Sequence, residues 1–301
     1  MANDELSPAP LPPADDSSTA STASTASSVD AAAEESLRVE NRELQERVAG
    51  LETQIRARSQ VALAQGVLMG RYRLDDPADA FALMRNVSQR FNVKLHQIAA
   101  VLTATPAPAP DAAEWFPYRA RTAAPSLKAL RAGPLDAKNQ GQVLGAALRR
   151  VLEVAGADAG NAQLSEGGAL RMEKHQGHPR AFTDYFAFVE GGTSCSRAAE
   201  AVRQVTVRDI ATAEVFDSET RQVILDSGSR GCHSVPLVDP DGGVRGVISS
   251  HHTHPVTGFT RTQLAAFDQV QRTTGEWLQW YAGTVVLDAL EQLHRTARDE
   301  S

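Results

Sequence analysis

The chain has 301 residues, 42% of them hydrophobic and 22% charged, which is enough for two ordinary globular domains. Its two cysteines, Cys195 and Cys232, are too few for a disulfide scaffold. No apolar run approaches the ~20 residues needed to cross a bilayer, and the N-terminus lacks a signal peptide. We therefore expect a cytoplasmic protein. The net charge of −7 is uneven, because residues 59–102 carry more Lys and Arg than Asp, and this permits nucleic-acid binding.

Two segments precede the first predicted domain. Residues 1–33 are mainly Ser, Thr, Ala, Pro and Asp, which leaves too little apolar surface to offset the entropy of ordering, so they predict a disordered tail. Residues 34–58 follow a heptad repeat, with leucines alternating with the β-branched Val48 and Ile55. This favours a parallel two-stranded coiled coil whose register is fixed by Asn41. The alternative is a single amphipathic helix packed on its own domain.

Residues 59–104 predict a small all-α bundle of three helices on this stem. Asp76 stands in an N-cap position and Pro77 follows it at the first helical position. Apolar side chains then recur on one helical face as far as Phe91, and Asn92 ends the helix. The segment from Val93 onwards supplies a short third helix.

The segments 61–69, 76–88 and 94–99 resemble the ANTAR domain of bacterial transcription antitermination regulators. The resemblance is carried by Ala64, Gly66, Met69, Ala80, Phe81, Arg85, Ser88, Leu95 and Ala99, with Met84 where the family has Leu. It implies a homodimer that binds two adjacent RNA hairpins of a nascent transcript and so prevents an overlapping terminator. RNA loops are read by stacking and by hydrogen bonds to unstacked bases. The polar side chains expected to contact RNA are Arg71, Arg85, Ser88, Gln89 and Lys94.

The sequence of the second half of the chain predicts a different module. Residues 105–124 are rich in Pro and Ala and predict an extended, semi-rigid linker. Residues 125–285 predict an α/β domain, an antiparallel sheet flanked by helices. It has an opening helix within 126–157, strands separated by glycine-rich turns, and a long amphipathic helix from residue 260. Residues 286–301 are expected to be the end of that helix and a tail.

This module resembles a GAF domain, which binds small molecules in many signalling proteins. The segments that carry the resemblance are 191–195 with Ala198, then 205–210, 234–237, 241–249 and 259–264. It implies a pocket beside the sheet but names no ligand. We expect Arg208 or Asp209 as a polar anchor, and the alternative is that the aromatic residues are simply core. The predicted lining is Phe182, Tyr185, Phe188, Cys195, Arg208, Asp209 and Phe216.

Several chemistries could use the cysteines and histidines of this module. A metal site of thiolates and imidazoles would draw on Cys195, Cys232, His233, His251, His252 and His254. The spacing is not C-x-x-C, so surface or core roles are favoured over a metal site or a redox pair. A haem held by a histidine has no support in the sequence. With no catalytic triad, carboxylate pair or phosphate loop, the sequence predicts no metal, no cofactor and no enzymatic activity.

The sequence thus predicts a signal-responsive antitermination regulator, in which a GAF-type sensor with an unknown small-molecule ligand controls an RNA-binding dimer. One alternative is a DNA-binding regulator whose third helix enters a major groove. Against it, only Arg90 and Lys94 lie near that helix, and no clear helix-turn-helix turn precedes it. A second alternative is a redox or small-molecule protein that uses the helical end only to dimerise.

Overall fold

The computed structural model describes residues 58–109 and 111–299, together with positions 36, 37, 40, 41, 44, 48 and 55. The chain divides into two compact units, Met1–Val48 and Ala49–Ser301. In the first unit the described residues are helical, and the heptad side chains of Leu37, Leu44 and Val48 are 65%, 49% and 54% exposed. The predicted tail and the other positions of this unit lie outside the described residues. No described helix is both long and apolar enough to span a membrane.

The second unit begins with a helical module, which comprises a helix at 58–72, α2 (Pro77–Phe91) and α3 (Leu95–Ala104). The predicted start of α2 is confirmed, because the Asp76 carboxylate accepts a hydrogen bond from the Ala78 N–H at 2.7 Å. Its predicted end is also confirmed: Asn92 has a left-handed φ of 52° and its N–H bonds to the Ser88 carbonyl. Met84 is fully buried between the helices.

The second module of this unit, called the sheet module, runs from residue 128 to residue 281 and has an antiparallel sheet at its centre. Its strands are β1 (Ala159–Glu166), β2 (Ala169–Gln176), β3 (Phe188–Val189), β4 (Val205–Val207), β5 (Gly231–Val238) and β6 (Val244–His252), in the order β3-β2-β1-β6-β5-β4. Two of the glycine-rich turns expected between strands make its hairpins. Gly167 and Gly168 both have positive φ, as a tight two-residue turn requires. Asp239 closes the other turn by accepting the N–H groups of Asp241 and Gly243 at 3.0 and 2.7 Å.

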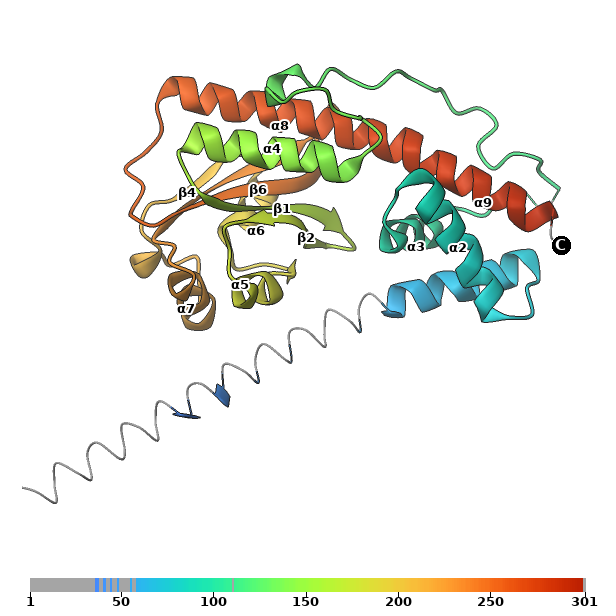
Figure 1. The fold of residues 1–301 in the computed structure, drawn as a ribbon, viewed down its shortest axis with the longest axis horizontal. Helices are drawn as coiled ribbons and strands as arrows, with labels where there is room; N and C mark the ends of the chain where they lie inside the picture. The colour runs from blue at the N-terminus through green and yellow to red at the C-terminus, as the bar shows by residue number, and fades with distance from the viewer. Residues whose placement is uncertain are drawn as a thin grey trace, which may run out of the picture. The chain divides into compact units, whose positions relative to one another are not determined.

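Helices cover both faces of this sheet (Figure 1). One face carries α4 (Gln140–Ala155) and α8 (Arg261–Tyr281), and the other carries α5 (Arg180–Tyr185), α6 (Ser194–Ala201) and α7 (Ser218–Asp226). Two short 3₁₀ turns complete the module: η1 (Lys128–Leu130) precedes α4, and η2 (Ile210–Thr212) lies between β4 and α7 in the chain. The helix expected across 126–157 begins only at Gln140. Pro134 disfavours helix in the residue before it, and the side chain of Asn139 caps the first turn.

The last helix connects the two modules. It continues from α8 through one π-helical turn, η3 (Ala282–Val286), into α9 (Leu287–Asp299). Figure 1 shows α9 lying along α2 and α3, with which it is in contact. Leu290 and Leu293 are fully buried and belong to the same core as Met84. Of residues 286–301, predicted to be the end of that helix and a tail, α9 is helical and packs on α2 and α3 of the helical module.

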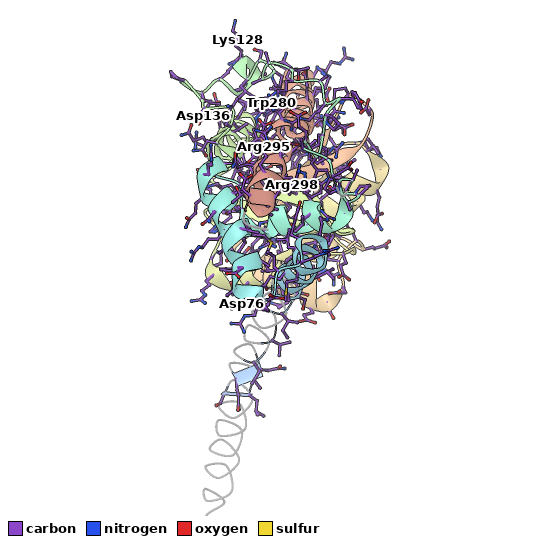
Figure 2. All side chains as sticks on the ribbon, turned by 90° about the vertical axis from the view of Figure 1, so that its right-hand side faces the viewer. Asp76, Lys128, Asp136, Trp280, Arg295 and Arg298 are labelled. Carbon is purple, nitrogen blue, oxygen red and sulfur yellow. The ribbon has the colours of Figure 1, made fainter. Side chains whose placement is uncertain are left out.

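The segment predicted as a linker is fixed to this last helix. The Glu291 carboxylate accepts the backbone N–H groups of Trp115 and Phe116 at 3.0 and 3.1 Å. Arg119 pairs with Asp288. At the end of α9, which faces the viewer in Figure 2, Arg298 donates to the Ala112 carbonyl. Residues 112–119 thus lie against α9, which is bonded to polar groups of Ala112, Trp115, Phe116 and Arg119.

Candidate nucleic-acid interface and ligand site

The outer side of α2 is the most open polar surface of the helical module. Arg85 and Gln89 lie one helical turn apart and are exposed, as are Asn86 and Arg90 beside them. No ion pair involving Arg85 is recorded among the described residues. A guanidinium and two amides on one helical face supply several hydrogen-bond donors. This surface can therefore donate to phosphate oxygens and to base edges.

The other three predicted RNA contacts are engaged within the protein. Ser88 donates its hydroxyl to the Val93 carbonyl at 2.7 Å, which ties the end of α2 to the start of α3. The guanidinium of Arg71 lies 4.7 Å from the ring centroid of Trp115, and burial there lowers its pKa. Lys94 forms an ion pair with Glu173 of β2. In this conformation only Arg85 and Gln89, of the five, are open to a partner.

Lys94 belongs to an interface cluster between the two modules, made of Lys94, His96, Glu166, Arg171 and Glu173. The Nδ1 and Nε2 atoms of His96 lie 2.9 Å from Glu166 and 3.3 Å from Glu173, although out of good hydrogen-bond alignment. Arg171 stands 3.5 and 3.6 Å from the same two carboxylates. Burial acts to lower the pKa of His96, but the carboxylates outweigh it and raise the pKa. The cluster therefore favours a positively charged imidazole.

Within the part of the chain that the structure describes, His96, Glu166 and Glu173 are also a group of metal-ligating side chains with ligand atoms within 4.8 Å of one another. A divalent ion there would have to displace the existing partners of both carboxylates. Lys94 and Arg171 already neutralise the two negative charges. The three side chains are suitable metal ligands, but the positive charges beside them disfavour a bound cation.

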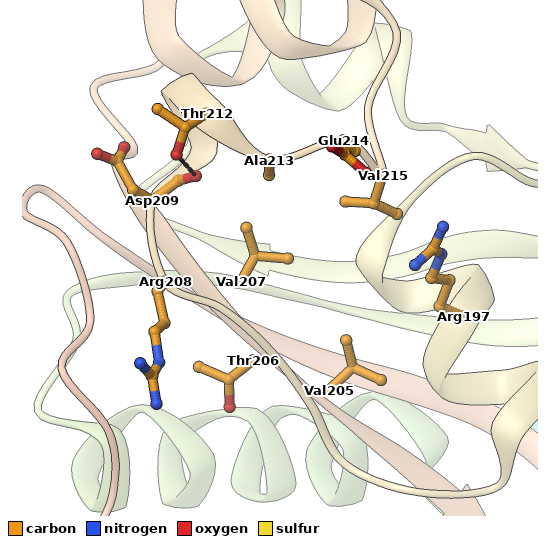
Figure 3. A pocket seen from close by; sticks show the side chains of 10 residues that line it. All are labelled: Arg197, Val205, Thr206, Val207, Arg208, Asp209, Thr212, Ala213, Glu214 and Val215. Atoms are coloured by element: carbon orange, nitrogen blue, oxygen red, sulfur yellow. Dashed lines mark hydrogen bonds between the residues drawn. The ribbon is translucent and has the colours of Figure 1, made fainter.

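In the sheet module, a cavity of about 380 Å³ opens beside the edge strand β4. Figure 3 shows Val205 and Val207 on one side of this strand, with Thr206 and Arg208 on the other. Of the predicted ligand residues, Arg208 and Asp209 line the cavity, together with Arg197 of α6. Asp209 is held by the Ala211 N–H at 3.1 Å and by Arg230 at 3.2 Å. Arg197 and Arg208 give this lining positive charge, which would suit an anion, and Figure 3 shows their guanidinium groups on opposite sides of the lining.

The remaining predicted ligand residues do not reach this cavity. Phe182, Cys195 and Phe216 are buried in the core between the sheet and α5–α7. The hydroxyl of Tyr185 hydrogen-bonds to that of Thr220 at 3.1 Å. Phe188 is half-buried on the short edge strand β3, with the guanidinium of Arg171 5.1 Å from its ring centroid. These side chains therefore pack in or beside the core and do not line one open pocket.

A polar layer inside this core was not predicted from the sequence. Asn161 Oδ1, Gln163 Oε1, His251 Nδ1 and both ring nitrogens of His178 are buried without a hydrogen-bond partner. His178 stacks on Phe182 with ring centroids 3.8 Å apart and meets His251 edge-on at 4.7 Å. Burial lowers the pKa of His178 to about 4, and that of His251 well below its usual value, so both rings are neutral. Unsatisfied buried polar atoms are costly, and a bound polar molecule would satisfy them.

The cysteines and the other histidines do not form one site. Strand alternation places Cys232 and His251 on the face under α5 and α6, and His233 and His252 on the face under α8. Here the ring of His233 lies 4.6 Å from that of Phe267. Both thiols are free and buried, and burial raises the pKa of Cys195 and that of Cys232, the latter to about 12. Neither thiol is a thiolate near neutral pH.

Comparisons with known proteins match the helical module to a family model and the sheet module to solved structures of low similarity. The family model of the ANTAR domain matches residues 49–102. No protein of curated function matches the chain significantly.

A similar solved structure is a domain of a two-component sensor histidine kinase protein from Sinorhizobium meliloti 1021, with 18% identity, a TM-score of 0.40, and coverage of 46% of this chain and 91% of that one. The GAF domain/HD domain protein from Geobacter sulfurreducens has 12% identity, a TM-score of 0.39, and coverage of 52% and 97%. Type II free methionine-R-sulfoxide reductase from Thermoplasma acidophilum has 17% identity, a TM-score of 0.39, and coverage of 48% and 97%.

Proposed function

We propose that this chain is a signal-responsive transcription antitermination regulator, because residues 49–102 match the ANTAR family model and the sheet with its flanking helices resembles a GAF domain. Its helical module binds paired RNA hairpins in a nascent transcript as part of a homodimer. Its sheet module receives a small-molecule signal and has no catalytic role. The ANTAR match carries the proposal, and the exposed donors of α2 supply a surface that fits RNA.

The RNA-binding part of the proposal is tested with the full chain, a two-hairpin RNA and a duplex DNA of equal charge over a salt series. We expect selective RNA binding. Arg85→Glu should weaken it about 10- to 100-fold, as expected for the loss of a charge-assisted contact. Arg149→Glu, an equal charge change on the exposed side of α4, is the matched control. Equal binding of RNA and DNA with a purely electrostatic salt slope would contradict the proposal.

The same assay separates regulation from thiol chemistry. The double variant Cys195→Ser/Cys232→Ser should bind RNA like the wild type. Its two buried, uncharged thiols contribute packing rather than reactivity.

The dimer is proposed to form through the heptad seam. The seam positions of the repeat carry four exposed apolar side chains. Their exposed fractions are 65% for Leu37, 49% for Leu44, 54% for Val48 and 62% for Ile55. A lysine at a seam position places like charges opposite one another at the dimer axis. Val48→Lys should therefore give a monomer in sedimentation velocity, and Glu46→Lys, at an outward position of the same repeat, should stay dimeric. A Val48→Lys protein with dimer mass would refute the seam.

The signal is proposed to be an uncharged polar molecule that enters the layer between β1, β6 and α5. Neutral imidazoles and amide oxygens surround that layer, with Phe182 available for stacking. In a thermal-shift screen of nucleobases, amides, sugars and small anions, a neutral compound should raise the melting temperature of the wild type. His251→Leu should abolish this response. If only anions stabilise the protein, and Arg208→Ala removes the effect, the ligand occupies the cavity beside β4 instead.

A further inference from the structure

The start of α3 faces the hairpin formed by β1 and β2. Lys94 is the N-cap residue of α3 and its side chain caps nothing within the helix; it extends instead to Glu173. His96 follows in the first turn and lies between Glu166 and Glu173. The Glu173 side chain is 1% exposed and that of His96 10%, so this part of the contact is shielded from water, whereas the Lys94 side chain is 47% exposed. Two cationic groups of the helical module are thus covered by two carboxylates of the sheet module.

From this geometry we infer that Lys94 and His96 form a phosphate-binding site, and that Glu166 and Glu173 occupy it in this structure in place of RNA. The inference rests on the proposed function and adds its regulation. Carboxylate and phosphate oxygens accept charge-assisted hydrogen bonds from the same ammonium and imidazolium donors. The site continues the open surface of α2, because the bond from Ser88 to Val93 holds the start of α3 against the end of α2 that carries Gln89.

The charges of the interface cluster lower the cost of separating the two modules at this contact. Arg171 belongs to the sheet module and lies 3.5 and 3.6 Å from the two carboxylates. When α3 leaves, Glu166 and Glu173 keep Arg171 as a partner, which reduces the cost of leaving charges unpaired. Lys94 and His96 keep no carboxylate and are then free for phosphate. The sheet module and RNA therefore compete for the same two side chains.

The charges of the interface cluster also favour a phosphate over a metal ion. With a protonated His96, the cluster holds three positive groups, Lys94, His96 and Arg171, against two carboxylates. A divalent cation would add to an existing positive excess, whereas a phosphate would be drawn to it once the carboxylates withdraw. His96 was not among the residues expected from the sequence to contact RNA. Its position between Glu166 and Glu173 follows only from the packing of the modules.

The test measures binding of a two-hairpin RNA to the full chain by fluorescence anisotropy. Glu166→Gln/Glu173→Gln should bind RNA about tenfold more tightly than the wild type, within the usual range of coupling between sites. The control Glu200→Gln/Glu219→Gln makes the same change in net charge at exposed positions of α6 and α7, and should gain about twofold at most. Adding His96→Ala to the first variant should remove most of its gain. The single variant Glu166→Gln, at the less buried carboxylate, should show a smaller gain in the same direction.

The outcomes separate the inference from the proposed function. RNA-selective binding with equal affinity for the wild type and for Glu166→Gln/Glu173→Gln would overturn the inference and leave the proposed function intact. A gain no larger than that of the charge control would also overturn it. Tight Zn²⁺ binding by the wild type that is lost in His96→Ala would assign the cluster to a metal instead. No RNA selectivity in any variant would refute the proposed function, and the inference with it.

Discussion

Gly275→Val is expected to remove most of the stability of the sheet module. At this position α8 crosses the end of β5 so closely that a Cβ atom would lie 2.0 Å from the Val238 carbonyl oxygen and 2.3 Å from its carbon. These are backbone atoms, so they cannot turn aside as a side chain can. Ordinary overpacking costs about 1–3 kcal/mol, and a clash with a strand backbone should exceed it. A loss of about 4 kcal/mol is a large part of the ~5–15 kcal/mol that stabilises a domain.

The measurement is urea unfolding followed by circular dichroism. Gly283→Ala is the matched control, because Gly283 lies in the same continuous helix and an added Cβ would meet nothing within 4 Å. Alanine is favoured over glycine in a helix by up to ~1 kcal/mol, so this control should be unchanged or slightly more stable. Equal stability of Gly275→Val and the wild type would show that α8 does not lie this close to β5.

Local features of the fold were predictable because their causes are local. Asp76, Pro77 and Asn92 mark the ends of α2 by their own backbone chemistry. Gly167–Gly168 and the Asp239 turn fix their hairpins in the same way. Such residues determine φ and ψ or satisfy a neighbouring N–H group, so no distant contact is needed to interpret them.

Contacts between distant segments were not predictable. The amphipathic pattern of residues 287–297 shows that one helix face is apolar, but not that it packs on α2 and α3. Similarly, Arg85 and Lys94 look alike in the sequence as cations on short helices. Only the structure shows that Arg85 is open while Lys94 is paired with Glu173, a residue 79 positions away. The buried polar layer around His178 and His251 also depends on which strands become neighbours.

Leu290→Ala/Leu293→Ala is expected to unfold the helical module while the sheet module persists. Both leucines are fully buried and share a core with Met84 and Ile98. A buried Leu→Ala change costs about 2–5 kcal/mol, and two in one small core approach the whole stability of a module of this size. Hydrogen exchange should become much faster for residues 58–104 and stay slow for β1 and β6. Asp299→Ala, at the exposed end of α9, is the control and should exchange like the wild type.

This result would also identify the route between sensor and output. The helical module is joined to the sheet module by the segment 105–124 and by the continuous helix α8–η3–α9, and the first of these is itself held by α9 through Glu291. A ligand that displaces α8 therefore acts on α9 directly, and through α9 on α2 and α3. Unchanged exchange of residues 58–104 in Leu290→Ala/Leu293→Ala would instead show that the helical module folds without α9. The interface cluster at Lys94 and His96 would then be the principal contact through which the sensor acts.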